Sequence, residues 1–278
     1  MLKQRILTAI VLLAVLLPAL FYPLPGPFCL LALMLIGAAC WEWGRLNGLL
    51  HVGSLGLAAV CVTTCSAFWA LAWLVKPLPF LWVAVGLLWV VGGGFLLAYG
   101  VKGWMLVPKS LRLLGGVVVL CVAWLAIAQA RLLGIEFLLS VMLLVWVADI
   151  GAYFAGRRFG GRFSRSKLAQ SISPGKSWEG VWGGMLGVVV MAGIWLMADP
   201  NGHTLFHRLT AQYGVTAMTI AVIFLAAMSV VGDLVESLIK RSTGAKDSSR
   251  LLPGHGGVLD RVDALLRTLP LARMLVSF

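Results

Sequence analysis

The chain has 278 residues, of which 61% are hydrophobic and only 12% are charged. A soluble domain usually carries about twice that share of charged residues, and it could not hide so much apolar surface in one water-excluding core. The composition therefore excludes an ordinary soluble domain and favours an integral membrane protein.

The formal net charge of +12 could by itself suggest nucleic-acid binding. The basic residues, however, stand in short segments between apolar runs, where anionic lipid headgroups and the orientation of the spans account for most of them. We therefore expect membrane lipids, and no nucleic acid, as partners of this charge. An anionic substrate would be a second use for it.

The first apolar segment follows Lys3 and Arg5, as the apolar segment of a secretory signal peptide follows basic residues. The run that comes next contains Pro23 and Pro25 and offers no clear small-residue cleavage site. A retained first helix is therefore the favoured interpretation.

The apolar runs predict an all-α, polytopic membrane protein, because a spanning helix needs about 20 mainly apolar residues. We expect about nine transmembrane helices in a single membrane domain, 1–278, with N-terminal helices in 1–135 and a second region in 136–278. Eight runs are strong and the ninth, at 262–278, is weak. The strong runs are 6–22, 28–43, 53–75, 79–99, 113–131, 136–155, 180–198 and 213–236.

The basic residues also predict the orientation. If the N-terminus is cytoplasmic, only Lys76, Arg131 and Arg208 among the loop-proximal cations fall on the far side, which agrees with the positive-inside rule. Both long polar loops, 156–179 and 237–263, then face the cytoplasm.

Acidic residues concentrate near these two loops. Eight of the ten lie between positions 149 and 263, and all of these except Asp199 lie in or beside the two loops, namely Asp149, Glu179, Asp233, Glu236, Asp247, Asp260 and Asp263. A charged side chain at membrane depth costs about 2.5–3.5 kcal/mol on insertion scales, so this clustering needs a cause. A divalent cation held by carboxylates and a polyphosphate held by basic side chains would supply one.

Two blocks carry the strongest pattern. The first block is 231–241. If the eighth helix continues through it, one face presents Asp233, Glu236, Ser237 and Lys240 at i, i+3, i+4 and i+7. The second block is 246–263. It contains the run 253–257, Pro-Gly-His-Gly-Gly, whose backbone can approach phosphate oxygens closely. Asp260 and Asp263 follow it, one helical turn apart.

These blocks resemble the signature of the phosphatidate cytidylyltransferase (CDP-diacylglycerol synthase) family. The matching pattern is Ser237-x-Ile239-Lys240-Arg241-x4-Lys246-Asp247, then Pro253-x-His255-Gly256-Gly257-Val258-x-Asp260-Arg261-Val262-Asp263. Two further stretches resemble the same family, Asp149-x-Gly151-Ala152-Tyr153-x-x-Gly156 and Ser173-Pro174-Gly175-Lys176-Ser177-Trp178-Glu179-Gly180. The likeness extends over essentially the full chain. It departs near the end, at Ala264, where the family usually has Ser, and in a last helix that holds Arg267 and Arg273.

The resemblance implies an enzyme of the inner, cytoplasmic membrane that converts CTP and phosphatidic acid to CDP-diacylglycerol and pyrophosphate. It implies Mg²⁺ or Mn²⁺ as cofactor, with a second cation as an option, and an active site on the cytoplasmic side in the region 136–278. A homodimer is left open as the assembly.

The same resemblance implies the site residues. Asp233 and Asp260 match the metal-binding carboxylates, and Glu236 and Asp263 are further candidates. The other residues implied in catalysis are Lys240, Arg241, Lys246, Asp247 and Arg261. The residues implied in substrate binding are Ser173, Lys176, Ser177, Ser237, His255, Gly256 and Gly257.

Alternatives remain at this stage. A CTP-dependent polyprenol kinase would share the membrane and the nucleotide but would transfer the γ-phosphate. A transporter would place acidic residues near the middle of its spans, often within internal repeats, and no repeat is visible. Other features have a structural interpretation. We interpret Trp41-Glu42-Trp43 mainly as an anchor at the membrane interface, with the role of the Glu42 carboxylate open. We interpret the five cysteines as apolar filler, because Cys61 and Cys65 lack the further His or Cys partners, such as a third thiol, that a zinc site needs.

Overall fold

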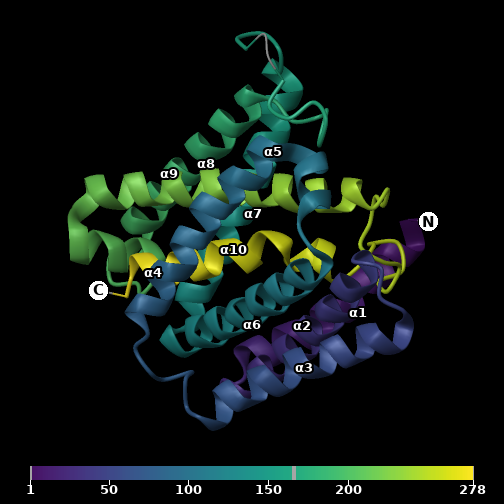
Figure 1. Cartoon of the computed structure of the whole chain (residues 1–278). Helices are drawn as coiled ribbons and strands as arrows, with labels where there is room; N and C mark the ends of the chain where they lie inside the picture. The colour runs from purple at the N-terminus through teal and green to yellow at the C-terminus, as the bar shows by residue number, and fades with distance from the viewer. Residues whose placement is uncertain (1, 165–166, 278) are drawn as a thin grey trace.

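The structure is a computed structural model that describes residues 2–164 and 167–277. Every regular element in these two ranges is a helix (Figure 1), which confirms the all-α prediction. The helices are α1 (Leu2–Phe21), α2 (Gly26–Leu46), α3 (His51–Ala70), α4 (Pro79–Leu87), the π-helix η1 (Leu88–Gly92), α5 (Gly93–Leu106), α6 (Lys109–Leu133), α7 (Ile135–Phe159), α8 (Trp178–Ala198), α9 (Leu205–Ser242) and α10 (Leu259–Leu275).

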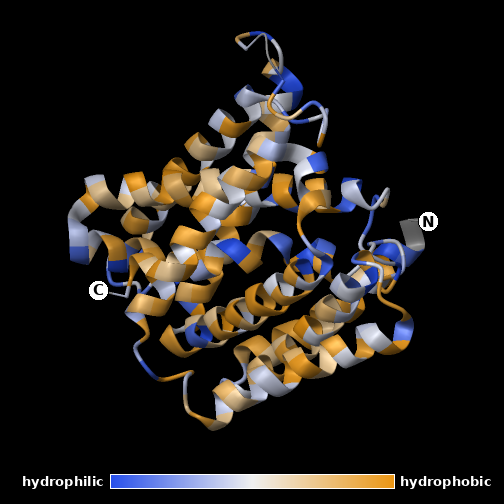
Figure 2. Ribbon diagram, viewed as in Figure 1, coloured by the Kyte–Doolittle hydropathy of each residue, from blue (hydrophilic) through white to orange (hydrophobic). Residues whose placement is uncertain are grey.

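Eight helical segments of the described chain are long and apolar enough to cross a membrane, with α4, η1 and α5 forming one of them. Their outward side chains are large and hydrophobic, among them Val11 on α1, Leu114 on α6 and Ile194 on α8. Figure 2 shows hydrophobic residues along the long helices and hydrophilic residues gathered mainly in the connecting loops. A polytopic membrane protein is therefore confirmed.

The helix ends follow from local sequence. Pro25 precedes α2 and Pro79 begins α4, where a missing N–H and a fixed φ are tolerated. Within α9 the backbone departs from helical geometry at Gly214, whose φ is +83°, a conformation that glycine adopts without steric penalty. The predicted span 213–236 begins at this break, and the helix continues beyond it to Ser242.

The last helix, predicted as a weak span at 262–278, begins earlier and lies inside the bundle. α10 crosses between α9 and α6 and also packs against α4 (Figure 1). Arg267 and Arg273 are both buried, and Arg273 donates to the Oε1 atom of Gln129 on α6 at 2.9 and 3.2 Å. Protein surrounds these polar side chains, which explains how α10 can be less apolar than the eight long segments.

Small residues bring α7 and α8 into close contact. A Cβ atom added at Gly184 would lie 2.6 Å from the carbonyl oxygen of Ala148, and one added at Gly151 would lie 2.9 Å from that of Gly183. Only residues without a side chain allow backbones to approach this closely in a membrane. This crossing fixes the position of the segment that precedes α8 relative to α7.

All five cysteines are buried, as expected of apolar filler. The prediction that Cys61 and Cys65 lack a third thiol was wrong, because α6 places Cys121 beside them. The Sγ atoms of Cys61 and Cys121 lie 3.5 Å apart.

The two polar connections are shorter than predicted, at 160–177 and 243–258, because α7 and α9 end later, and α8 and α10 begin earlier, than the predicted loop bounds. Residues 165 and 166 of the first connection lie outside the described residues. The second connection meets the start of α1, where Thr8 donates to the carbonyl of Pro253 at 3.0 Å. The start of α1 therefore lies at the same end of the bundle as this connection, while the C-terminal end of α10 lies at the opposite end (Figure 1).

Candidate active site

Three carboxylates converge where α9 meets α10. Asp233 and Glu236 lie one turn apart on α9, and α10 brings Asp263 to them. One oxygen of each carboxylate lies within 4.8 Å of the others. We call Asp233, Glu236 and Asp263 the acidic cluster. Oxygen ligands suit hard divalent cations, and the cluster offers three carboxylates in one place.

Asp260 lies outside the acidic cluster and is joined to it through Lys240. The Nζ atom of Lys240 lies 3.0 Å from the Oε1 atom of Glu236 and 2.9 Å from the Oδ1 atom of Asp260. The sequence predicted Asp233 and Asp260 as the principal metal pair, with Glu236 and Asp263 as additions. The structure instead groups Asp233 with those two additions.

The carboxylate of Asp260 closes the turn of the second connection. It accepts hydrogen bonds from the N–H of Ser248 at 2.9 Å, from the hydroxyl of Ser248 at 3.0 Å and from the N–H of Gly257 at 2.8 Å. Burial by itself would raise the pKa of Asp260, but Lys240 and these backbone donors outweigh it, so the pKa is lowered. Asp260 is therefore held as a carboxylate with most of its acceptor capacity in use.

The second connection is fixed from α2 by Glu42, whose side chain is completely buried. Its carboxylate accepts from the hydroxyls of Ser248 and Ser249 at 3.0 and 2.5 Å, and from the N–H groups of Val258 and Leu259 at 2.9 and 2.7 Å. The interpretation of Trp41-Glu42-Trp43 as an interface anchor missed this role. The available signal was a carboxylate within an apolar segment, which needs a partner.

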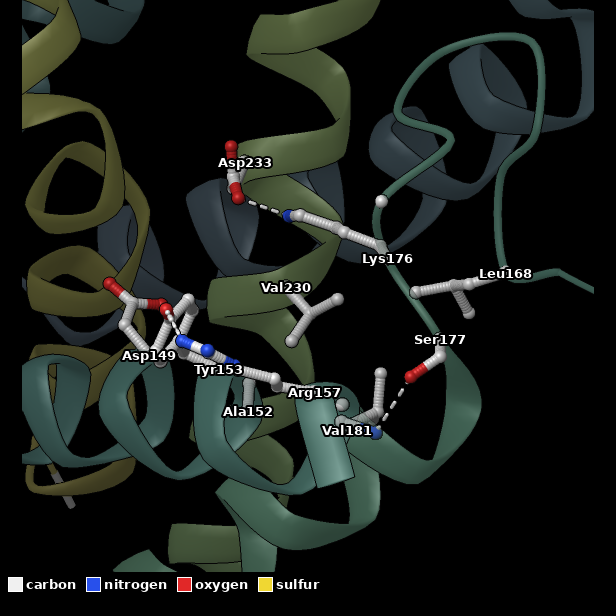
Figure 3. Close-up of a pocket in the computed structure, with 13 residues that line it drawn as sticks. Asp149, Ala152, Tyr153, Arg157, Leu168, Lys176, Ser177, Val181, Val230 and Asp233 are labelled. Carbon is white, nitrogen blue, oxygen red and sulfur yellow. Dashed lines mark hydrogen bonds and ion pairs between the residues drawn. The ribbon is translucent and has the colours of Figure 1, made fainter. Parts of the chain in front are cut away.

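A cavity of about 400 Å³ opens beside the acidic cluster. Asp149, Tyr153 and Arg157 line it from α7, Lys176 and Ser177 from the segment just before α8, and Asp233 from α9 (Figure 3). The Lys176 ammonium forms an ion pair with the Asp233 carboxylate. The cavity therefore joins residues of the first connection to residues of α7, α8 and α9.

Hydrogen bonds hold the cavity wall in shape. The hydroxyl of Ser177 accepts from the N–H of Gly180 at 3.2 Å and so caps the N-terminus of α8. Arg157 donates to the hydroxyl of Tyr153 at 3.0 Å. The buried Glu179 accepts from the N–H groups of Phe163 and Ser164 at 3.1 and 2.8 Å, which ties the first connection to α8.

The remaining predicted site residues lie outside both the acidic cluster and the cavity lining. Arg241, Lys246, Asp247 and Arg261 are exposed. Arg261 donates to the carbonyl of His255 at 2.7 and 3.0 Å. Ser173 forms part of the turn before Lys176, with its carbonyl accepting from the N–H of that lysine, and Ser237 lies half-buried on α9.

The two glycines of the second connection have structural reasons to be glycine. Gly256 has a φ of +83°, and a Cβ atom there would lie 2.7 Å from the Oδ2 atom of Asp260. At Gly257 a Cβ atom would lie 2.6 Å from the Oε1 atom of Glu42. The close approach of this backbone is therefore to the protein's own carboxylates.

The profile of the cytidylyltransferase family matches residues 3–278. The chain belongs to this family. Two relatives named phosphatidate cytidylyltransferase are similar over almost their whole length. The protein of Haemophilus influenzae is 38% identical over 97% of this chain and 96% of its own length, and that of Pseudomonas aeruginosa is 39% identical over 97% and 95%.

A third cytidylyltransferase relative, the phosphatidate cytidylyltransferase of Brucella melitensis, is 46% identical over a shorter stretch, which covers 48% of this chain and 42% of its own length. The full-length matches include both α2, which carries Glu42, and the α9–α10 region, which carries the acidic cluster. Family membership thus extends to both parts of the molecule that build the site.

Proposed function

We propose that the protein transfers the cytidylyl group of CTP to phosphatidic acid, forming CDP-diacylglycerol and releasing pyrophosphate. We call the cavity of about 400 Å³ that Lys176 lines the Lys176 cavity. The observation that carries the proposal is the acidic cluster beside this cavity, in a bundle of membrane-spanning helices. The names of the two full-length relatives support the choice of substrates.

The reaction needs positioning and charge neutralisation more than a general base. An oxygen of the lipid phosphate attacks the α-phosphorus of CTP, a new P–O bond forms, and the bond to the β-phosphate oxygen breaks as pyrophosphate leaves. The attacking phosphate is already anionic near neutral pH. The difficulty is to bring two anions together in line and to stabilise the charge on the departing oxygen.

The cavity contains the cations for this task. Lys176 points into it from the segment before α8, and Arg157 lines it from α7. Both would bind phosphate oxygens of the nucleotide through charge-assisted hydrogen bonds. The ion pair with Asp233 keeps the Lys176 side chain extended towards the acidic cluster in the absence of substrate.

The acidic cluster fits a divalent cation. Asp233, Glu236 and Asp263 would hold Mg²⁺ or Mn²⁺, and Lys240 would keep Glu236 oriented from the opposite side. When bound, such an ion neutralises phosphate charge and polarises phosphoryl oxygens. Asp260, bonded to Lys240 and to the backbone, orders the second connection next to this cluster.

We also propose that the protein lies in the cytoplasmic membrane with this end of the bundle facing the cytoplasm. The distribution of basic residues supports this orientation, and the nucleotide substrate is a cytoplasmic metabolite. A single chain holds every residue used here, so the proposal does not require a homodimer.

The test is product analysis with the purified protein. CTP labelled at the α-phosphate, supplied with phosphatidic acid and Mg²⁺, should yield labelled lipid, and CTP labelled at the γ-phosphate should yield labelled pyrophosphate. Omitting either phosphatidic acid or the divalent cation should abolish both products. Labelled lipid from γ-labelled CTP, with release of CDP, would identify a lipid kinase and contradict the proposal.

A further inference from the structure

A second cavity, of about 430 Å³, lies among α5, α6, α9 and α10. Its lining is mostly apolar and aromatic and includes Trp89, Leu96, Trp104 and Val118. Glu236 and Asp263 of the acidic cluster also line it. The cavity therefore joins an apolar space within the bundle to the carboxylates of the candidate active site.

Arg267 projects into this cavity from α10 as a buried cation with free donors. Only 2% of its surface is exposed. Its Nε and Nη2 atoms have no hydrogen-bond acceptor anywhere in residues 2–164 and 167–277. A guanidinium presents five N–H donors, and leaving buried donors unpaired costs about 1–3 kcal/mol for each group. The arrangement is explained if a ligand supplies the missing acceptors.

The surrounding residues make room for this side chain. Gly232 on α9 lies directly against the Arg267 guanidinium, so that any larger residue at position 232 would displace it. The guanidinium also stacks over Trp89, with its Cζ atom 5.7 Å from the ring centroid. Arg267 is thus positioned by α9 and by η1, and the donors that remain free belong to the cavity wall.

A second arginine lines the same cavity. Arg112, near the start of α6, lies with its Cζ atom 5.9 Å from the ring centroid of Trp104. Its Nε atom is also buried without a partner in the part of the chain that the structure describes. Two guanidinium groups with unused donors therefore face one apolar cavity.

These features together select the chemistry of the ligand. A neutral lipid would leave the arginine donors unpaired, and a free nucleotide would leave the apolar walls of the cavity uncovered. An anionic phosphate attached to hydrocarbon chains satisfies both parts. Glu236 and Asp263 line the same cavity and repel a phosphate. The phosphate must therefore lie next to the arginines, or a cation must separate it from these carboxylates.

We infer that this cavity binds the phosphatidic acid substrate, with Arg267 and Arg112 donating to its phosphate and with the apolar walls between α5 and α6 contacting its acyl chains. The inference rests on the proposed function for the identity of the lipid. The Lys176 cavity then binds the nucleotide, and the second cavity, which Arg267 and Arg112 line, binds the lipid. The acidic cluster lies between the two substrates. Arg267 is then a substrate-binding residue on the helix that also carries Asp260 and Asp263.

The test is direct binding, measured by quenching of tryptophan fluorescence. Phosphatidic acid with brominated acyl chains is added to the purified protein in phosphatidylcholine nanodiscs. The difference between the wild type and Trp89→Phe isolates the signal from the cavity. We expect saturable quenching of Trp89 by brominated phosphatidic acid, and little by brominated phosphatidylcholine or diacylglycerol at the same mole fraction.

Arginine variants decide the role of the guanidinium. Arg267→Gln should weaken phosphatidic acid binding about tenfold or more, the loss expected for a charge-assisted hydrogen bond, and should raise the KM for the lipid while leaving that for CTP unchanged. Arg267→Lys should weaken binding several-fold, because the charge remains but the planar fork is lost. Arg273→Lys is the matched control, since Arg273 packs against Gln129 on the same helix, and it should bind the lipid as the wild type does.

The outcomes separate this inference from the proposed function. If Arg267→Gln does not fold, the two lysine variants decide the question. CDP-diacylglycerol synthesis with unaltered lipid binding in the Arg267 variants would overturn the lipid site and leave the enzyme intact. Saturable binding without product would overturn the proposed function and leave the lipid site. Equal quenching by phosphatidylcholine would show general lipid contact and overturn the inference.

Discussion

The carboxylate of Glu42 on α2 accepts a hydrogen bond from the backbone N–H of Leu259, the first residue of α10, at 2.7 Å and across 217 positions of the chain. The same carboxylate binds the N–H of Val258 and the hydroxyls of two serines. A residue of the N-terminal half therefore fixes the start of the helix that carries Asp260 and Asp263.

Replacing Glu42 should impair catalysis by loosening the second connection. Glu42→Ala would leave the hydroxyl of Ser249 and the N–H groups of Val258 and Leu259 without an acceptor, at about 1–3 kcal/mol for each one that water does not reach. The hydroxyl of Ser248 would still have Asp260 as its acceptor. We expect turnover to fall at least about tenfold and proteolysis within 243–258 to become faster, since stability lost locally raises the open population. Glu136→Gln is the control, because Glu136 is exposed and contacts the N–H of His203 elsewhere in the structure. Wild-type turnover and protease resistance in Glu42→Ala would contradict the positioning role.

The acidic cluster predicts which carboxylates govern the metal requirement. Asp233→Asn, Glu236→Gln and Asp263→Asn should each raise the Mg²⁺ concentration needed for half-maximal activity about tenfold or more. Asp260→Asn should lower turnover while leaving that concentration nearly unchanged, because Asp260 binds Lys240 and the backbone of the second connection. Titration of activity with Mg²⁺ in the four variants is the measurement.

A large shift of the Mg²⁺ requirement in Asp260→Asn, with none in Glu236→Gln and Asp263→Asn, would return the metal site to the pair Asp233 and Asp260 expected from the sequence. Thermal unfolding in detergent controls for stability, since each variant must melt close to the wild type for the comparison to hold. Direct Mn²⁺ binding, measured by electron paramagnetic resonance, provides a reading that does not depend on turnover.

The sequence predicted the helices and the family better than the geometry of the site. Apolar length predicted eight spans because a helix in lipid must satisfy its backbone internally. The i, i+3 spacing also predicted correctly that Asp233 and Glu236 share a face of α9. Neither rule places one helix against another, so the choice between Asp260 and Asp263 as the neighbour of Asp233 required the packing of α10.

The residues that sequence patterns missed act across long chain separations. Glu42 was interpreted from its tryptophan neighbours, although its partners lie more than 200 positions away. Arg267 and Arg273 made the last helix look poorly suited to lipid, and the structure explains both by burial within the bundle. For Glu42 and Arg273, a charged residue among apolar neighbours indicated that a partner exists without indicating which one.

The close crossing of α7 and α8 predicts a difference between two glycines of the same helix. A Cβ atom at Gly184 would lie 2.6 Å from the carbonyl oxygen of Ala148, whereas Gly193 has nothing within 4 Å. Gly184→Ala should therefore lower the melting temperature by several degrees, because the backbones must separate. Gly193→Ala should leave it unchanged or raise it slightly, since alanine favours a helix by about 0.5–1 kcal/mol over glycine. Equal effects in thermal unfolding would show that the crossing can relax.

The orientation of the bundle predicts the accessibility of two opposite loops. Thr243, in the second connection, and Asn201, between α8 and α9, are both exposed. They flank the long segment α9, so they should lie on opposite sides of the membrane. With the five native cysteines buried, Thr243→Cys should react with a membrane-impermeant maleimide in inverted vesicles and Asn201→Cys in right-side-out vesicles. The reverse pattern would place the acidic cluster away from cytoplasmic CTP and would overturn the proposed topology. Labelling of both cysteines from the same side would show that α9 does not cross the membrane.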